Sequence, residues 1–167
     1  MPAVFSSHGV AGEAVQHTVL QISTRQAIEF VDLTARLQEV VAESFLVEGL
    51  LMIQSRHTTA GLLINESEPL LLEDLTELFE RLVPAYFTYR HDDFHRRSNL
   101  AAAERVNGHA HCRAALLRTS ECLPVTNGAL SLGCWQRVFF IDFDGGQQRE
   151  VWLTLLGRRQ LVPTARA

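Results

Sequence analysis

The chain has 167 residues, of which 47% are hydrophobic and 20% are charged, so it can bury one good core and is expected to form a single domain over residues 1–167. Its net charge of −4 disfavours nucleic acid as a partner, because binding by phosphate neutralisation needs a basic face. All 15 basic residues are arginine, and the absence of lysine excludes Schiff-base catalysis and a P-loop lysine.

The three cysteines are an odd number and follow no metal-ligand spacing, which favours a reducing compartment. We expect Cys112, Cys122 and Cys134 to be small residues of the core. Residues 1–11 carry neither the basic nor the apolar region of a secretory signal, and no segment reaches the roughly 18 apolar residues needed to span a bilayer. The expectation is therefore a cytoplasmic protein that does not engage a membrane.

Hydrophobic patterning places the core at residues 17–157, and both ends of the chain are expected to be loose. Residues 18–23 and 26–31 alternate apolar and polar side chains as half-buried strands do, and the short turn between them predicts a hairpin. A helix follows, with Asp32 or Thr34 as its cap.

The next segment, residues 49–55, reads as a buried strand that leads to His57. A second round repeats this plan with a strand at residues 60–65 and a helix that Pro69 opens and Pro84 ends. The many polar residues that follow predict a long loop.

The last part of the chain predicts a short helix at residues 108–117 and then three strands, at residues 122–125, 135–143 and 150–156. Two glycine-containing turns, Asn127-Gly128 and Asp144-Gly145-Gly146, separate these strands and predict hairpins. The full order is β-β-α-β-β-α-β-β-β, an α+β fold with mostly antiparallel sheets and two main helices.

Several histidines lie where predicted elements end, and imidazole is the commonest protein ligand for transition metals. His57 follows a buried strand and His91 lies in the polar loop. His109 and His111 would point the same way on a strand and about 200° apart on a helix, so only one of them is expected to be a ligand. For each histidine a solvated surface position is the alternative, and arginines surround His95, which favours a surface position there.

Two carboxylates accompany these histidines. Glu66 follows the strand that begins three residues after His57, so it can serve as a general base or as a hydrogen-bond partner of a ligating histidine. Asp92 stands beside His91. Without lysine or a reactive cysteine motif, these carboxylates are the proton acceptors expected to govern turnover.

The pattern of motifs resembles the YjbQ-like family over residues 17–157. The matching segments are His57-Thr58-Thr59-Ala60, Asn65-Glu66, Pro69 with Asp74, Tyr89-Arg90-His91-Asp92, His111, Leu123-Pro124-Val125, Gly128, Gly133-Cys134-Trp135-Gln136 and Asp142-Phe143-Asp144-Gly145. The chain departs from the family at Cys134, where threonine is usual, and at Gly146-Gln147, where members often have Pro-Arg.

The resemblance implies an α+β domain of two related halves that assembles as a homotrimer. It also implies a metal site formed by His57, His91 and His111. Catalytic roles then fall to Glu66 and Asp92. Substrate-binding roles fall to the family positions Thr59, Asn65, Trp135 and Gln136.

Members of the family are known as secondary thiamine-phosphate synthases, which join a pyrimidine diphosphate to a thiazole phosphate and release pyrophosphate. The implied partner is thus a small phosphorylated substrate. Three imidazoles suit zinc better than magnesium, which prefers oxygen ligands, so the expected cofactor is a divalent metal, zinc before magnesium. This mismatch with pyrophosphate chemistry leaves two alternatives open: a metal-dependent hydrolase, and a non-catalytic protein that binds a metal or small molecule.

Overall fold

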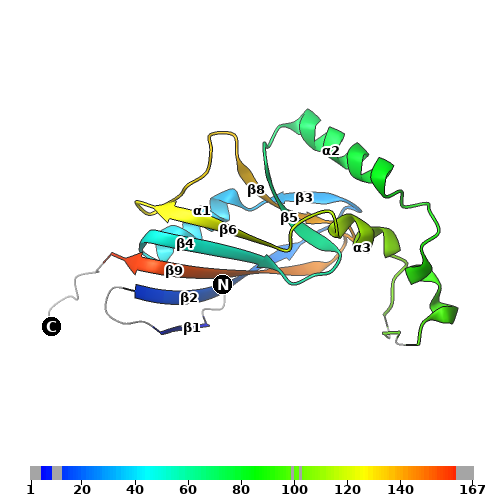
Figure 1. The fold of residues 1–167 in the computed structure, drawn as a ribbon, viewed down its shortest axis with the longest axis horizontal. Coiled ribbons are helices and arrows are strands. Elements are labelled where there is room, and N and C mark those ends of the chain that lie inside the picture. The colour runs from blue at the N-terminus through cyan, green and yellow to red at the C-terminus, as the bar shows by residue number, and fades with distance from the viewer. Residues whose placement is uncertain (1–4, 9–12, 99, 102, 161–167) are drawn as a thin grey trace.

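Two antiparallel sheets organise the computed structural model, which describes residues 5–8, 13–98, 100–101 and 103–160 (Figure 1). The large sheet has the order β1-β2-β9-β4-β6-β7 and the small sheet the order β3-β8-β5. The strands are β1 (Phe5–His8), β2 (Glu13–Ser23), β3 (Glu29–Asp32), β4 (Leu46–Ser55), β5 (Ala60–Asn65), β6 (Ser120–Thr126), β7 (Ala129–Leu130), β8 (Arg137–Asp142) and β9 (Gln148–Arg159).

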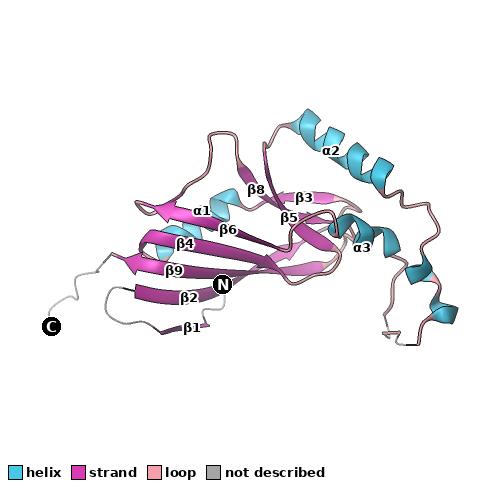
Figure 2. Ribbon diagram, in the orientation of Figure 1, coloured by secondary structure: helices cyan, strands magenta, loops and turns pink. Residues whose placement is uncertain are grey.

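Three α-helices occur among the described residues, and they lie on the sheets or at one end of them (Figure 2). They are α1 (Thr34–Glu43), α2 (Pro69–Leu82) and α3 (Gly108–Ala114). The loop between α2 and α3 contains two short 3-10 turns, η1 (Arg90–Asp92) and η2 (Phe94–Arg96). The expected class, a single α+β domain with antiparallel sheets, is confirmed.

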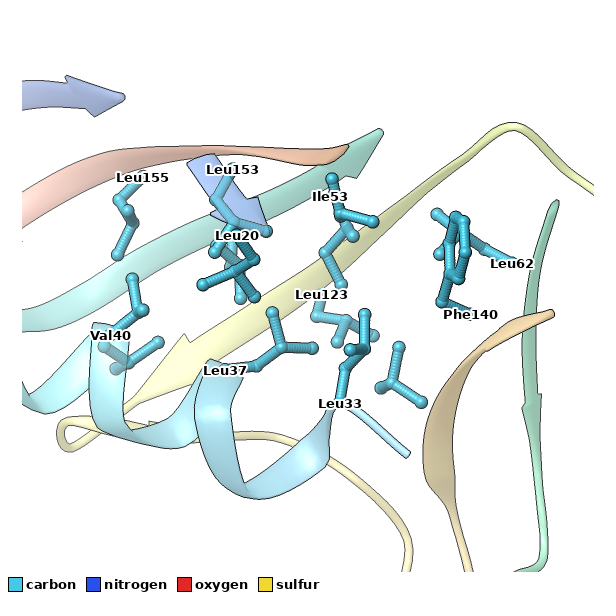
Figure 3. Close-up of a cluster of buried hydrophobic side chains, with 14 of the residues drawn as sticks. Leu20, Leu33, Leu37, Val40, Ile53, Leu62, Leu123, Phe140, Leu153 and Leu155 are labelled. Carbon is cyan, nitrogen blue, oxygen red and sulfur yellow. The ribbon is translucent and has the colours of Figure 1, made fainter. Parts of the chain in front are cut away.

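The main core lies between α1 and the inner face of the large sheet (Figure 3). Alternation along β4 places Leu51 and Ile53 in this core, while Leu50 and Met52 point outward and are 43% and 41% exposed. Leu37 of α1 is fully buried on the opposite side. The helix forms because its apolar residues recur on one face and the sheet offers a surface to cover.

Strand β8 is buried on both faces, which explains its unbroken apolar run. Val138 and Phe140 belong to the main core, whereas Phe139 and Ile141 belong to a second cluster with Phe79 of α2. A strand covered on both sides has no polar face, so its hydrophobicity is continuous rather than alternating.

The hairpin predicted from residues 18–23 and 26–31 is wrong. Strand β2 pairs with β9 in the large sheet, and β3 pairs with β8 in the small one. The turn between them is a crossover between sheets, and it is held by a long-range contact, a 2.6 Å hydrogen bond from Thr24 Oγ1 to Asp142 Oδ2. Local alternation of apolar and polar residues indicates that a segment forms a strand, but it does not determine which other strand it pairs with.

The predicted turn at residues 144–146 is likewise a crossover, since it joins β8 of the small sheet to β9 of the large one. A Cβ at Gly145 would overlap the carbonyl oxygen of Gln26, so the two crossovers touch and require glycine at this position. The turn at Asn127 and Gly128 is confirmed, because β6 pairs with β7 around it. Both residues have positive φ. The predicted pairing with the strand at residues 135–143 is wrong, since that strand is β8 of the small sheet.

Three further expectations need correction. Cys112, Cys122 and Cys134 are all exposed rather than in the core; Cys122 follows the outward alternation of β6, between buried Leu123 and half-buried Glu121. The N-terminal segment is not wholly loose, since Phe5–His8 forms β1 against β2.

The structure does not describe residues 1–4, 9–12 and 161–167, so the rest of the two ends that were expected to be loose lies outside the described residues.

The helix cap also differs from expectation. The N-cap of α1 is Leu33, and the Asp32 carboxylate instead accepts a hydrogen bond from Thr34 N at 2.8 Å.

Helix α2 begins and ends as predicted. The Glu68 side chain accepts hydrogen bonds from the amides of Leu70 and Leu71, and Pro69 occupies the first turn, where its missing N–H is not needed. No helix among the described residues is long and apolar enough to cross a membrane.

Candidate functional site

Two histidines from separate elements lie side by side beyond the end of the large sheet. His91 of η1 and His111 of α3 have ring centroids 4.5 Å apart, with ring planes inclined by 59°. Asp92 holds these elements together, because its Oδ1 accepts hydrogen bonds from the amides of Asn107 and Gly108 at 3.0 and 2.9 Å. The polar loop thereby brings His91 to the start of α3.

His57 lies on the neighbouring segment, and its side chain binds a strand edge. Strand β4 ends at Ser55, which pairs with Val151, so the next amide of β9, that of Glu150, lies beyond the last pair. Nε2 of His57 accepts a hydrogen bond from this amide at 2.8 Å. Neutral imidazole has one unprotonated nitrogen, and this bond uses it.

His57 and His111 are connected through Thr58, whose backbone is hydrogen-bonded to the His111 ring. Burial, and then the positive charge of Arg149, lower the pKa of His57 below its ordinary value. Burial, and then the neighbouring His91, lower the pKa of His111. Both rings are therefore biased toward the neutral form that a metal ligand or an acceptor requires.

The three predicted ligands do not form a complete metal site in this conformation. Among the described residues, no three His, Cys, Asp or Glu side chains are arranged to share one ion. His91 and His111 are adjacent, as two ligands of one ion would be. His57 is near them in the chain fold, but its lone pair faces Glu150.

An ion pair between Arg97 and Glu104 contacts His91, and all three residues belong to the loop between α2 and α3. Arg97 Nη1 donates to Glu104 Oε1 at 2.8 Å and to the carbonyl oxygen of His91 at 3.3 Å. Glu104 Oε1 also lies 3.9 Å from Nε2 of His91. The hydrogen bond from Arg97 is the main cause that lowers the pKa of Glu104.

A buried polar network lies behind the histidines. Arg149 donates from Nε and Nη2 to the two oxygens of Asp142, each at 2.8 Å, and from Nη2 to Thr59 Oγ1 at 3.1 Å. Burial opposes ionisation of Asp142, but the hydrogen bonds from Arg149 and Thr24 outweigh it and lower the pKa of the carboxyl. Thr59, a predicted substrate-binding residue, is thus buried and engaged inside the protein.

Asn107 connects this network to Asp92. Its Nδ2 donates to Asp144 Oδ2 at 2.9 Å, and Asp144 also pairs with Arg105 at 3.1 Å. Asn107 Oδ1 is buried and has no hydrogen-bond partner among the described residues. An unpaired buried acceptor is costly, so this oxygen favours a water or ligand donor here.

The other predicted site residues lie at the opposite end of β5. Ala60 pairs with Asp142 at the histidine end, and Asn65 pairs with Arg137 at the far end. The strand rise of about 3.3 Å per residue separates the two ends by about 16 Å. Within one chain, Asn65 and Glu66 therefore do not line the same site as His57.

Trp135 and Gln136 share this far end, in the turn before β8. The Trp135 side chain is 70% exposed. Gln136 Oε1 accepts a hydrogen bond from Gly133 N at 2.8 Å, which closes the turn, and Asn65 Oδ1 accepts one from Glu66 N at 2.9 Å.

Two ion pairs were not expected from the sequence, the buried pair of Arg149 and Asp142 and the pair of Arg97 and Glu104. A charged residue at the end of an otherwise apolar strand, as Asp142 is, was the available signal. Arg97 and Glu104 lie in a long loop without regular spacing, so nothing in the sequence indicated that these two charges would pair.

Comparison with known proteins agrees with this architecture. The family model described as UPF0047 protein YjbQ-like matches residues 18–158. A UPF0047 protein of Archaeoglobus fulgidus is 38% identical over 132 residues, covering 79% of this chain and 94% of its own. UPF0047 protein YugU of Bacillus subtilis is 31% identical, covering 83% and 97%.

Solved structures give the same result. A YbjQ-like protein of unknown function from Sulfolobus solfataricus has a TM-score of 0.78 at 27% identity, covering 87% of this chain and 99% of its own. An uncharacterized conserved protein of the yjbq/upf0047 family from Clostridium acetobutylicum has a TM-score of 0.72 at 30% identity, covering 82% and 98%. The fold thus defines an α+β domain of two antiparallel sheets with histidines at one end. The chain belongs to the YjbQ-like UPF0047 family.

Proposed function

We propose that the protein is a metal-dependent enzyme that acts on a small phosphorylated substrate and resembles secondary thiamine-phosphate synthase. The observation that carries this proposal is the adjacent pair of half-buried imidazoles, His91 and His111, from separate elements. They would hold a divalent cation, zinc rather than magnesium, because nitrogen ligands suit zinc. The cation would supply positive charge to a departing pyrophosphate.

The remaining groups fit such a role to different degrees. The contact of His111 with the Thr58 backbone is the kind of second hydrogen bond that orients a ligating histidine. His57 would complete the trio only when its ring releases the Glu150 amide, because that bond uses its lone pair. Arg97 is paired with Glu104 and stabilises the loop that carries His91.

A non-catalytic metal or small-molecule binder is the second candidate. The carboxylates nearest the histidines already have structural partners, since Asp92 binds two backbone amides and Glu104 binds Arg97. Glu66 lies at the other end of β5, so it reaches the histidines only when a second copy of the chain brings it there.

Metal content tests the proposal directly. Protein purified without chelator is expected to contain a divalent metal by elemental analysis, and His91→Ala and His111→Ala should lose most of it. His57→Ala should lose part. His95→Ala is the matched control, because His95 is an exposed histidine of the same loop. Full occupancy in all three site variants would show that the trio is wrong.

Activity separates the two candidates. Wild-type protein should form thiamine phosphate and pyrophosphate from a pyrimidine diphosphate and a thiazole phosphate, and a chelator should abolish this. A metal-loaded protein that binds these substrates without turning them over would support the binder instead.

A further inference from the structure

A cavity of about 780 Å³ lies at the opposite end of the large sheet from the histidines. The lining residues come mainly from the end of α1, the start of β4 and the end of β9. Strand β4 runs from this cavity at Leu46 to Ser55 near the histidines, so about 30 Å separates the two places at about 3.3 Å per residue. The volume falls within the range of about 300–1,000 Å³ that small-molecule sites occupy.

The walls of this cavity combine an apolar surface with two cations. Phe45, Leu46 and Val47 are apolar lining residues, and Arg158 and Arg159 are the cationic residues among those that line the cavity. No described carboxylate lies within ion-pair distance of either arginine. Nη2 of Arg159 donates to Gln16 Oε1 at 2.6 Å, while its Nε is buried without a hydrogen-bond partner among the described residues.

Phe45 provides an independent sign of function. Its φ of +57° is in the left-handed region, and it follows the C-cap Ser44 of α1, a position where glycine is favoured. A bulky side chain in this conformation costs folding free energy. The ring belongs to neither hydrophobic core and is 53% exposed, so core packing does not offset the cost. Strain of this kind is typically retained at ligand-binding positions.

We propose that this cavity is a second small-molecule site, which binds an amphipathic carboxylate. The carboxylate group would pair with Arg158 and Arg159, and the apolar body would pack against the Phe45 ring. A guanidinium matches a carboxylate through two parallel N–H donors, and an exposed aromatic ring next to it suits an aliphatic or aromatic chain.

Octanoate is the probe for this site, and 1-octanol is the uncharged probe of the same length. Isothermal titration calorimetry on the full chain should detect octanoate binding, and Arg159→Gln and Arg158→Gln should each weaken it by about tenfold or more. Arg25→Gln, at an exposed arginine outside the cavity, should bind as wild type. Octanol should bind more weakly than octanoate and equally to all four proteins.

Phe45→Gly separates binding from folding. Glycine removes the strain and the ring together, so this variant should show a higher midpoint of thermal unfolding and at least tenfold weaker octanoate binding. A variant that is merely misfolded would lose both. His91→Ala should bind octanoate normally, so the outcome is independent of the proposed metal site.

Three results would overturn the proposal. The first is the absence of octanoate binding to the full chain. The second is binding that is the same in the arginine and Phe45 variants as in wild type. The third is competition between octanoate and self-association, seen as binding that weakens when protein concentration rises, because a second copy would then occupy the cavity.

Discussion

At the scale of single residues, the pair of Arg149 and Asp142 joins the two sheets. Arg149 belongs to β9 of the large sheet and Asp142 to β8 of the small one, and both side chains are buried. Thr24 and Thr59 satisfy remaining hydrogen-bonding positions of this pair. A buried ion pair is stable only when its partners are satisfied in this way, so its members cannot be changed singly without cost.

Asp142→Asn should therefore destabilise the protein by about 3–5 kcal/mol, because Arg149 keeps its charge in a buried place. Urea denaturation measures this. Glu121→Gln, which removes the partner of the exposed Arg118, should cost less than about 1 kcal/mol. Equal effects of the two substitutions would contradict the role assigned to Asp142.

Because the pKa of Asp142 is lowered in the folded protein, the contribution of this pair to the free energy of unfolding depends on pH. A carboxyl whose folded pKa lies below its unfolded value contributes stability that is complete above the unfolded pKa and is lost as pH falls through the folded pKa. The free energy of unfolding of wild type should thus fall below about pH 4. Asp142→Asn should show a shallower fall in this range.

Near neutral pH, the histidines determine the pH dependence. His57 and His111 have lowered pKa values in the folded state, so acidification favours protonation of the unfolded chain. Stability should decline as pH falls through about 6.5, the ordinary histidine pKa. Chemical denaturation of metal-free protein between pH 7.5 and 5.5 should show this decline. It should be smaller in His57→Ala and unchanged in His95→Ala.

Glu66 is the residue on which the enzymatic proposal can be tested most sharply. Glu66→Gln keeps the shape and removes the basicity, so thiamine-phosphate formation should fall by about 10²-fold or more while metal content holds. Asp92→Asn should also lower the rate. Removal of the three exposed cysteines should leave the rate near wild type. A loss confined to the cysteine variants would instead support a thiol-based mechanism.

At the scale of elements, the arrangement depends on two crossovers that touch. The connection from β2 to β3 and the connection from β8 to β9 each pass between the sheets, and they meet where Gly145 approaches Gln26. Strand β8 is central to the small sheet, so any displacement of this contact moves the strand that carries Asp142. Packing at this point therefore controls the position of the polar network.

Gly145→Ala should destabilise the protein by about 1–3 kcal/mol or more, because the added methyl group has to displace backbone rather than a flexible side chain. Gly133→Ala is the control, since its methyl group would meet only the end of the Gln136 side chain. Thermal unfolding monitored by circular dichroism compares the two. A Gly145→Ala protein as stable as the control would show that the crossovers can separate freely.

At the scale of the whole molecule, apolar side chains remain exposed on the outer face of the large sheet. Leu50 pairs in register with Leu156, and these residues are 43% and 48% exposed, beside Met52 at 41%. Adjacent exposed apolar side chains of this kind mark surfaces that associate. They are consistent with the homotrimer that the family resemblance implies, which would also supply the second copy that brings Glu66 toward another histidine site.

Light scattering should give three times the chain mass of 18.7 kDa at micromolar concentration. Met52→Glu, which places a charge on this apolar face, should lower the mass toward that of one chain. Ala35→Glu adds the same charge at an exposed position of α1, which covers the opposite face of the sheet, and should leave the mass unchanged. A monomeric mass for wild type would contradict both the trimer and a site shared between copies.

The sequence by itself determined the kinds of element and much of their extent. Periodicity and terminal residues locate α2 between Pro69 and Leu82 and β5 at Ala60–Asn65, because these signals are local to the chain. Motif spacing indicated the family and, with it, the trio His57, His91 and His111. The structure places His91 and His111 side by side, while His57 is hydrogen-bonded to the amide of Glu150.

Tertiary structure alone decided which strands pair and which polar groups meet. Alternation in β2 and β3 is compatible with a hairpin, but β2 pairs with β9 in the large sheet and β3 pairs with β8 in the small one. The same holds for the site: His57 binds a strand edge, and Glu66 lies at the far end of β5. Contacts between residues far apart in the chain depend on the packing of whole sheets, which no local pattern encodes.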